Sequence, residues 1–374
     1  MGEERARPRI AIVGPVFPYR AVIPYCTTRL AAEMARTCDV TILSFKRQYP
    51  RWFYPGGDDI DESLRPLTPA GARFVLDIIN PLTWLRAARM LRRERPDAVI
   101  FVWWIWVWTL PYRTLMALLP RRTRVILQCH NIGEKEPAWW KRALANLVLR
   151  RGDVLVVHAK SEAEEAARRI GERRAASSER VVQTFLPVLE VGTAAPSREQ
   201  AKKELKLNGN VALLFGHVRP YKGLDIALHA WPQLKADVTL LVAGEPWWKV
   251  NYPPQRNVRF DFRFIPDSEV ATYFAAADVV LAPYRVATQS GVALTGFHFG
   301  RPVIASSVGG LPDIIDGRNG ILIPPEDPAA LARAIDEFFL QRDRAAMERA
   351  AADSAKRYSW AEYGAIMSRL VTRA

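Results

Sequence analysis

Cysteine is scarce in this chain of 374 residues, which contains only Cys26, Cys38 and Cys129. Three scattered cysteines do not suit a disulfide framework and are typical of a protein from a reducing compartment. Long apolar runs are also missing, because no uncharged stretch reaches the ~18 residues that a membrane-spanning helix needs. Residues 1–8 are polar and charged and do not resemble a secretory signal peptide. These absences favour a cytoplasmic protein.

Metal-binding patterns are missing as well. No cluster of Cys and His has the spacing of a zinc site. The sequence Asp59-Ile60-Asp61 has a D-x-D form that can hold manganese, but it lies in the glycine-containing segment 55–64 without a preceding strand. This position predicts a solvated turn. We therefore expect neither a bound metal nor a cofactor.

Basic residues outnumber acidic ones. Lys and Arg total 53 against 39 Asp and Glu, a net charge of +14. Residues 1–190 carry 31 basic and 20 acidic side chains, or +11, which leaves +3 for the remainder. A basic first half is typical of proteins that meet nucleic acid, an anionic membrane or anionic substrates. A solvated basic face without a partner would give the same count.

Strands and helices alternate along the chain, which predicts parallel sheets covered by helices. The segment at 191–205 begins with small and polar residues and predicts a linker. The predicted organisation is a doubly wound α/β domain at 1–190, a second one at 206–358, and a C-terminal helix at 359–374 that packs back on the first. Ligands are expected beyond the carboxyl ends of the strands, in a cleft between the domains.

A pair of basic residues follows the first strand of the second predicted domain. That strand ends at Phe215-Gly216, a loop carries Arg219 and Lys222, and Gly223 leads into a helix. Guanidinium and ammonium groups bind phosphate oxygens by charge-assisted hydrogen bonds. The Walker spacing is absent, which argues against nucleotide hydrolysis. Taken alone, the pair could equally be two solvated loop cations.

A second anion-binding pattern lies in the segment PYRVATQSGVALTGFHFGRPVIAS at 283–306. Ser290 is placed to cap a helix, and Gly291 allows close approach to the backbone. The first amides of that helix, at Gly291 and Val292, then form an anion site assisted by the helix dipole. The alternative is an ordinary capped helix. Because two such loops follow strands of one predicted domain, a diphosphate is the expected ligand.

The chain resembles the group 1 glycosyltransferases, the retaining family 4 enzymes of GT-B fold, over most of residues 211–339. The resemblance rests on motifs that occur in the family's order: GxxRPYKGLD, GEPWW, ATQSG, FGRPVIASSVGGLPDII and NGILIPPEDPAALARAI. It implies two Rossmann-like domains that face a central cleft. It also implies a hexosyltransferase that moves a sugar from a nucleotide-diphosphate donor, such as a UDP-sugar or GDP-sugar, to a hydroxyl acceptor with retention.

The resemblance also implies roles for individual residues. Arg219 and Lys222 would hold the donor diphosphate, and His130 would contact the transferred sugar. The nucleobase would meet backbone near Phe264 and Ile265. The donor-binding residues expected on this basis are Gly216, Ile265, Gln289, Ser290, Gly291, Val292 and Thr295. Weaker candidates on the acceptor side are Trp104, Asn131 and Glu136.

The sequence departs from the family at two places. The family usually has two glutamates flanking the phosphate loop, and here these positions fall on about Ala287 and Thr295. No carboxylate occurs anywhere between Tyr284 and Ser306, so Gln289 and Thr295 are expected to replace the missing groups by hydrogen bonding. The Gly-Gly turn after the first strand becomes Ala21-Val22. We interpret these departures as a variant form, with an inactive GT-B binding partner as the alternative.

Tryptophan is concentrated in two segments of the first half. Residues 101–112 and 137–152 hold six of the 12 tryptophans. Rings beside Arg and Lys suit a membrane interface, while about half of these rings are expected in the core. Trp104, Trp106 and Trp108 alternate, which predicts one face of a strand on the acceptor side. The expected partners are a nucleotide sugar, a lipid-linked or polysaccharide acceptor, and the anionic inner face of a membrane. Nucleic acid is not expected, because no recognition-module signature is present.

Overall fold

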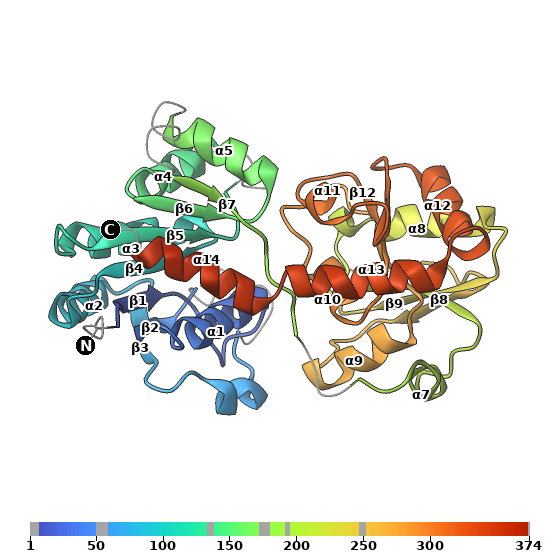
Figure 1. Cartoon of the computed structure of the whole chain (residues 1–374), viewed down its shortest axis with the longest axis horizontal. Helices are drawn as coiled ribbons and strands as arrows, with labels where there is room; N and C mark the ends of the chain where they lie inside the picture. The colour runs from blue at the N-terminus through green and yellow to red at the C-terminus, as the bar shows by residue number, and fades with distance from the viewer. Residues whose placement is uncertain are drawn as a thin grey trace, which may run out of the picture. The chain divides into compact units, whose positions relative to one another are not determined.

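The computed structural model divides the chain into two compact units (Figure 1). The first unit comprises Met1–Phe185 with Trp360–Ala374, and the second comprises Leu186–Ser359. The structure describes residues 7–49, 59–132, 138–171, 180–190, 195–246 and 252–372. Each unit is an α/β layer structure with its own hydrophobic core.

The first unit contains a seven-stranded parallel sheet of order β3-β2-β1-β4-β5-β6-β7. Its strands are β1 (Arg9–Val13), β2 (Asp39–Arg47), β3 (Arg73–Asp77), β4 (Ala98–Trp103), β5 (Arg124–Cys129), β6 (Val154–Val157) and β7 (Val181–Gln183). Every residue of β4 is buried, because helices cover both faces of a parallel sheet. The crossover β1–α1–β2 runs along the sheet in the direction opposite to β3–α2–β4. Right-handed connections therefore place α1 and α2 on different faces.

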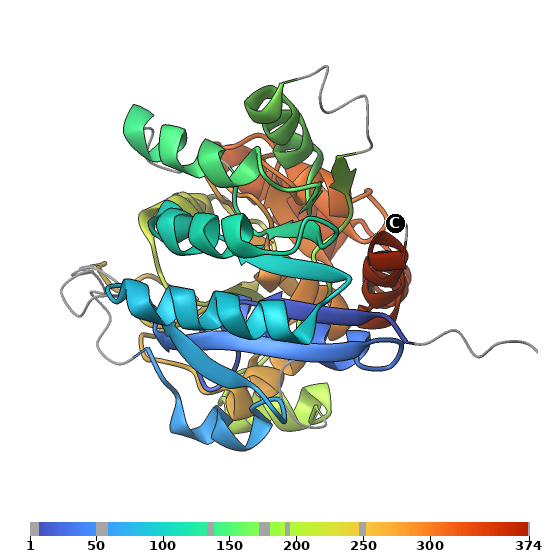
Figure 2. The same ribbon diagram turned by 90° about the vertical axis from the view of Figure 1, so that its left-hand side faces the viewer.

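Helices α2, α3 and α4 lie side by side in the first unit (Figure 2). The helices of this unit are α1 (Val22–Met34), α2 (Pro81–Glu94), α3 (Thr109–Leu118), α4 (Trp139–Leu149), α5 (Lys160–Ile170) and α14 (Trp360–Thr372). The Asn80 side chain caps α2 by accepting a hydrogen bond from the amide of Leu82 at 3.1 Å. Helix α14 packs against α1, and the hydroxyls of Thr37 and Ser368 lie 3.0 Å apart.

The second unit contains a six-stranded parallel sheet of order β10-β9-β8-β11-β12-β13. Its strands are β8 (Asn210–Phe215), β9 (Val238–Ala243), β10 (Val258–Asp261), β11 (Val279–Ala282), β12 (Val303–Ser306) and β13 (Gly320–Ile323). Its helices are α7 (Arg198–Glu204), α8 (Leu224–Ala230), α9 (Asp267–Ala276), α10 (Gly291–His298), α11 (Leu311–Ile314), α12 (Pro328–Leu340) and α13 (Arg344–Arg357). Both units are doubly wound parallel-sheet structures, which confirms the predicted fold class.

Strand β8 marks the point where the order of the second sheet reverses. It pairs with β9 on one side and β11 on the other, so the connections after β8 and β11 leave in opposite directions. Such a reversal leaves space for a ligand beyond the carboxyl ends of the two strands. The loops at that place are residues 216–223 and 283–290, which are the two loops singled out in the sequence.

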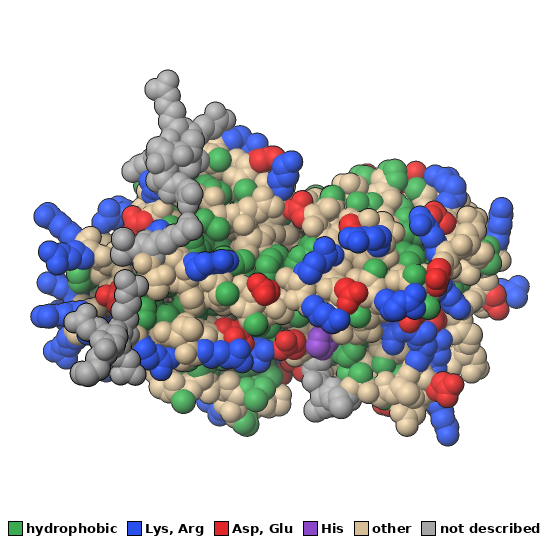
Figure 3. Space-filling model, viewed as in Figure 1, with side chains coloured by type: hydrophobic (Ala, Val, Ile, Leu, Met, Phe, Trp, Pro, Cys, Tyr) green, Lys and Arg blue, Asp and Glu red, His purple; other side chains and the backbone are tan. Residues whose placement is uncertain are grey.

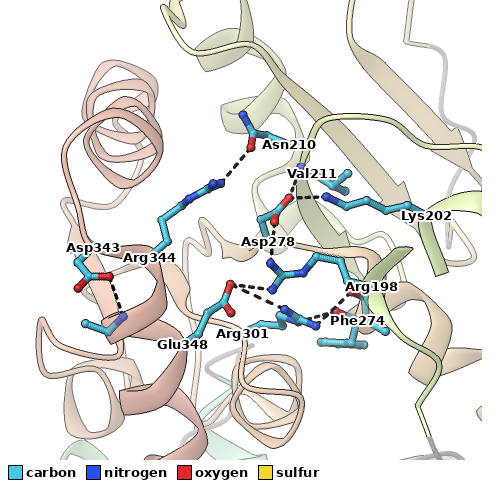
Figure 4. A network of polar contacts seen from close by, with 12 residues as sticks. Arg198, Lys202, Asn210, Val211, Phe274, Asp278, Arg301, Asp343, Arg344 and Glu348 are labelled. Atoms are coloured by element: carbon cyan, nitrogen blue, oxygen red, sulfur yellow. Dashed lines mark hydrogen bonds and ion pairs between the residues drawn. The ribbon is translucent and has the colours of Figure 1, made fainter. Parts of the chain in front are cut away.

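The amino end of the same sheet carries a network of charged side chains (Figure 4). Asp278, directly before β11, is 4% exposed and accepts from the amide of Val211 at 2.8 Å. Lys202 donates to the same carboxylate at 3.0 Å, and Arg198 lies 3.3 Å from its other oxygen. Arg198 also reaches Glu348 of α13 at 2.7 Å. The network thus fastens α7 and α13 to the sheet.

Candidate functional site

The loop after β8 is shaped by glycines. Gly216 has φ +85° and donates its amide hydrogen to the Ala243 carbonyl at 2.9 Å. Gly223 has φ +69°, and a Cβ at this position would lie 2.0 Å from the Pro283 carbonyl oxygen. Only glycine allows this approach, so the loops after β8 and β11 touch directly at Gly223.

The Lys222 side chain lies between the carboxyl end of β8 and the first turn of α10. The residue is 8% exposed, and its Nζ donates to the Phe215 carbonyl at 3.0 Å. A Cβ added to Gly216 would lie 2.9 Å from this Nζ and 3.8 Å from a methyl group of Val292. The ammonium group and the first turn of α10 therefore both lie within 4 Å of one point beside Gly216. The structure brings together a cation and a helix N-terminus that sequence reasoning paired.

The start of α10 exposes backbone donors. The Ser290 hydroxyl accepts from the amide of Ala293 at 3.2 Å, as expected of a helix cap. Within the described residues, the amides of Gly291 and Val292 donate to no acceptor, which is usual for a first turn. These amides and the helix dipole favour an anion at this end of α10. Thr295 is buried, and its hydroxyl donates to the Gly291 carbonyl at 2.8 Å.

Arg285 joins the two loops, a role that the sequence did not reveal. Its guanidinium forms a two-pronged contact with Asp225 at 2.6 and 2.9 Å and donates to the Pro220 carbonyl at 2.7 Å. The backbone amide of Arg285 donates to the Tyr221 carbonyl at 2.8 Å. The contact with Arg285 holds the pKa of the Asp225 carboxyl below its usual value. A basic residue three positions after the end of β11 is the only sequence signal for this bridge.

A third loop, after β12, packs against the loop after β11. Gly309 has φ +56°, and a Cβ there would lie 1.6 Å from the Ala287 carbonyl oxygen. The amide of Gly310 donates to the Thr288 carbonyl at 3.0 Å. Ala287 stands at one of the two positions that lack the expected glutamate. Its carbonyl is covered by Gly309, so three consecutive strand-end loops form one packed layer.

His217 stands beside Lys222 and Arg219 in the loop after β8, and its pKa responds to their charges. The pKa of His217 is held below its usual 6.5, first by burial and then by the charges of Lys222 and Arg219. Glu245, whose carboxylate lies 3.8 Å from His217 Nδ1, acts in the opposite direction. The part of this shift that comes from Lys222 and Arg219 indicates a positive potential at this loop, as an anion site requires. His217 was missed in the sequence, although it stands between Gly216 and Arg219.

The residues expected near a nucleobase lie after β10. Ile265 is buried, whereas Phe264 is 43% exposed. The preceding Arg263 contacts Asp261, Glu269 and the Tyr273 hydroxyl. Burial and the hydrogen bond to Asp261 raise the pKa of Tyr273 to about 12. This network holds the backbone at Arg263, directly before Phe264 and Ile265, against the start of α9.

His130 follows β5 at the carboxyl end of the first sheet. Burial lowers its pKa to about 4, so the ring is neutral near pH 7. Its Nε2 and the Oδ1 of the neighbouring Asn131 are buried and bond to none of the described residues. The His158 ring lies 5.1 Å away and its Nε2 lies 3.0 Å from the Tyr363 hydroxyl of α14. Glu136 lies outside the described residues.

The tryptophans after β4 do not share one strand face, and the expectation based on their alternation is wrong. Strand β4 ends at Trp103, and Trp106–Trp108 form a short 3₁₀ turn. Trp108 is fully buried, while Trp104 is half-buried and donates to the Tyr49 hydroxyl at 2.7 Å. A period of two has no meaning in such a turn. The rings of Trp104 and Trp108 both pack on Phe45, with centroids 5.8 and 4.1 Å from its ring, whereas Trp106 packs on Trp140 at 4.8 Å.

The turn after β1 keeps a glycine-like backbone without a glycine. Ala21, which stands before α1, has φ +96° and ψ 172°. An alanine in this region costs about 1–3 kcal/mol. The conformation explains why relatives place glycine here. The departure at Ala21 therefore changes the side chain and the strain, but not the path of the turn.

The D-x-D segment leads into a short 3₁₀ helix at Glu62–Leu67. The Asp61 side chain accepts from the amide of Ser63 at 2.9 Å, and Ile60 bridges to Tyr19. Within the part of the chain that the structure describes, no three His, Cys, Asp or Glu side chains are grouped as metal ligands would be. In the same residues no helix combines the length and apolarity needed to span a membrane.

Known structures share this architecture. HepE from Anabaena, in a complex with UDP-glucose, matches with a TM-score of 0.75 over 98% of this chain and 100% of that chain, at 15% identity. Sucrose-phosphate synthase from Thermosynechococcus elongatus matches with a TM-score of 0.66 over 97% and 98%, at 19% identity. At such identities the likeness shows the fold alone. The chain has the GT-B fold of two Rossmann-like domains.

Sequence families match both units. Residues 23–182 match a glycosyl transferase 4-like domain, and residues 209–340 match the glycosyl transferases group 1 domain. A D-inositol 3-phosphate glycosyltransferase of Streptomyces bingchenggensis is 32% identical over 233 residues, 56% of this chain and 50% of the relative. The chain spans about half the length of the curated relatives that it matches. Each unit therefore contains a region that matches a glycosyl transferase domain.

Proposed function

We propose that the protein transfers a sugar from a nucleotide-diphosphate sugar to a hydroxyl acceptor, and that the second unit holds the donor. The observation that carries this proposal is the meeting of Lys222 with the first turn of α10 beside Gly216. A buried ammonium and two amide donors offer a diphosphate several charge-assisted hydrogen bonds. Arg219 adds positive charge at the same loop. The UDP and UDP-glucose complexes of HepE support a uridine nucleotide as donor.

The chemistry follows from where the charge develops. The bond between the anomeric carbon and the β-phosphate oxygen breaks, and the acceptor oxygen forms the new bond to that carbon. Lys222, Arg219 and the α10 amides stabilise the negative charge on the leaving diphosphate, without a metal. The segment 285–305 contains no carboxylate that could act as a nucleophile. We therefore propose a front-face reaction with retention, in which a leaving phosphate oxygen receives the acceptor proton.

The acceptor is proposed to meet the first unit. His130 is neutral, and its unpartnered Nε2 can hydrogen-bond a sugar hydroxyl or the acceptor. Asn131, Trp104 and Glu136 remain weaker candidates for the same task. The basic and tryptophan-rich first unit supports a lipid-linked or polysaccharide acceptor at the inner face of a membrane. The three cysteines are free and buried, which agrees with the reducing interior of a cell.

The test begins with thermal unfolding in the presence of UDP-, GDP-, ADP- and TDP-sugars. A ligand that binds only the folded chain raises the midpoint temperature of unfolding. At a concentration of 100 times its Kd it adds about 2.7 kcal/mol to the free energy of unfolding. The stabilising donor is then used in a transfer assay with purified protein. The Arg219→Ala variant is expected to lose both the thermal shift and product formation. A wild-type chain that no nucleotide sugar stabilises, and that forms no product, would contradict the proposal.

A non-catalytic GT-B partner is the second candidate. It is favoured by the absence of both expected carboxylates, since Ala287 presents only a carbonyl covered by Gly309 and the Thr295 hydroxyl is bonded within α10. Such a partner would still bind the nucleotide sugar. Donor binding that depends on Arg219, without hydrolysis or transfer to any of several glycolipid and polysaccharide acceptors, would select this candidate.

A further inference from the structure

Helix α2 presents one exposed face that is apolar at its start and basic toward its end. Leu82 is 73% exposed, and Leu85 is exposed one turn later. The exposed positions follow at the spacing of a single helix face. They are Leu82, Leu85, Arg86, Arg89, Arg92 and Arg93. The opposite face buries Ala87, Ala88 and Leu91 in the core.

The four arginines of this face make no ion pair or hydrogen bond with their side chains among the described residues. The acid of α2, Glu94, is occupied by Arg73 at 2.8 Å. The sequence from 81 to 149 contains 12 Lys and Arg against four Asp and Glu. Arginines are normally paired or dispersed on a surface, so a row of four without carboxylates attracts anions and favours an anionic partner.

The neighbouring helices extend the same pattern. Leu110 of α3 is 60% exposed, and Trp139 at the start of α4 is 80% exposed. Large apolar side chains exposed to this degree on three adjacent helices form a surface that water solvates poorly. The same helices and the turn after α3 contribute further cations without ion pairs among the described residues: Arg113, Arg121, Arg122 and Arg142. Figure 3 shows Lys and Arg side chains gathered at the left, where Figure 1 labels α2 and α3.

We propose that the face formed by α2, α3 and α4 binds the surface of an anionic lipid bilayer. Arginines attract acidic headgroups, at about 1 kcal/mol for each cation near the surface, while Leu82, Leu110 and Trp139 enter the interface. A duplex or single-stranded nucleic acid would satisfy the arginines but would leave the exposed Leu82, Leu85 and Leu110 without a partner. A protein partner with an acidic, apolar surface is disfavoured because the cations spread over three helices and match a diffuse field better than a set of fixed carboxylates.

This inference goes beyond the proposed sugar transfer and does not rest on it. The face belongs to helices of the first unit, whereas the diphosphate loops belong to the second. A protein that binds bilayers without transferring sugar would support one conclusion and contradict the other. The two failures are therefore distinguishable.

The experiment is co-sedimentation of the full chain with large vesicles of phosphatidylcholine, with or without 30% phosphatidylglycerol — about one anionic lipid in three. The variant R86Q/R89Q/R92Q/R93Q removes the α2 cations. Its matched control, K203Q/K235Q/R256Q/R349Q, removes the same charge from exposed positions of the second unit. We expect binding to the anionic vesicles only, weakened at least about tenfold in the α2 variant and less than about twofold in the control.

A second variant tests the apolar part. L82S/L110S/W139S keeps every charge, and we expect it to lose the residual binding that wild type retains at 0.5 M salt, where electrostatic attraction is screened. Leu340→Ser, on an exposed apolar residue of α12, serves as its control. Circular dichroism and thermal unfolding confirm that each variant is folded.

Three results would overturn the proposal. Equal binding to neutral and anionic vesicles would exclude an electrostatic surface. Equal losses in the α2 variant and its control would show that total charge matters rather than this face. Tight binding to a 30-nucleotide DNA at 0.15 M salt, lost in the α2 variant while vesicle binding is absent, would assign the face to nucleic acid.

Discussion

The two ends of the second sheet both hold a buried or half-buried lysine, yet they use it differently. At the amino end Lys202 donates to the Asp278 carboxylate at 3.0 Å, and two arginines complete a network with Glu348 (Figure 4). At the carboxyl end Lys222 donates at the same 3.0 Å to a neutral carbonyl, that of Phe215. The first lysine contacts a carboxylate, whereas the second lies beside a further cation, Arg219, whose charge acts with that of Lys222 on His217.

This difference separates a structural site from a binding site within one sheet. The amino end gains stability because each carboxylate is matched by cations and an amide. The carboxyl end concentrates positive charge beside the open amides of α10, which favours an anion. The same residue type at equal distance therefore has opposite consequences. The difference can be tested by changing one end at a time.

The largest effect is expected for Lys222→Ala. Removal of this ammonium takes away a donor aimed at the leaving diphosphate, and kcat for sugar transfer should fall at least about 100-fold. The free energy of unfolding should change by less than about 1.5 kcal/mol, because the lost hydrogen bond ends on a carbonyl. Steady-state kinetics and urea denaturation measure the two quantities. A large loss of stability with an unchanged kcat would show that Lys222 stabilises the fold and does not act on the diphosphate.

Asp278→Ala should show the opposite result. It leaves Lys202, Arg198 and the Val211 amide without their shared acceptor, and the unfolding free energy should fall by about 3 kcal/mol. Nucleotide affinity measured well below the midpoint of unfolding should stay within twofold of wild type. Urea denaturation measures the unfolding free energy, and calorimetric titration measures the nucleotide affinity. A variant as stable as wild type would show that the amino-end network contributes no stability.

A smaller effect is expected from the packing between loops. Gly309→Ala places a methyl group 1.6 Å from the Ala287 carbonyl, so the loops after β11 and β12 must separate. The affinity for the nucleotide should fall about tenfold, since a shift of this size displaces the start of α10. Gly317→Ala is the matched control, because it has φ +79° but no atom within 4 Å of the new methyl group. Equal effects of the two substitutions would show that only the backbone conformation matters.

The smallest effect concerns pH. In the free protein Lys222 and Arg219 help to hold the pKa of His217 below 6.5, and a bound diphosphate should raise it. Binding then takes up a proton between the two pKa values, so affinity should rise a few-fold as pH falls through that window. His217→Gln should remove this part of the pH dependence and leave only that of the nucleotide. Titrations from pH 5.5 to 7.5 make the comparison, and identical profiles would contradict it.

Much of the fold could be predicted because its strands are continuous apolar runs. Strand β4 is buried throughout and lies in a sequence without polar residues from Ala98 to Trp108. The end of that strand could not be predicted, since Trp106–Trp108 continue the apolar pattern but form a 3₁₀ turn. Periodicity reports burial, and a buried turn is as apolar as a buried strand.

The candidate site was predicted where local sequence sets the geometry. Ser290 caps α10 because its hydroxyl reaches an amide three residues away, which a motif can encode. Arg285 and Gly309 were not predicted, because their partners come from other segments of the chain: Asp225 from the first turn of α8, and Ala287 from the loop after β11. Contacts between loops depend on the order of strands in the sheet, and that order is not written in any single segment.

The most direct test of the account is a calorimetric titration of UDP and GDP into two matched variants, Lys222→Gln and Lys202→Gln, at several salt concentrations. Both remove one positive charge from a lysine that donates at 3.0 Å within the second unit. We take whichever of UDP and GDP binds the wild type more tightly. Lys222→Gln should raise the Kd of this nucleotide at least about tenfold and make the Kd less dependent on salt, while Lys202→Gln should keep the Kd within about twofold of wild type. Equal Kd values for the two variants would contradict a diphosphate site at the carboxyl end of the second sheet.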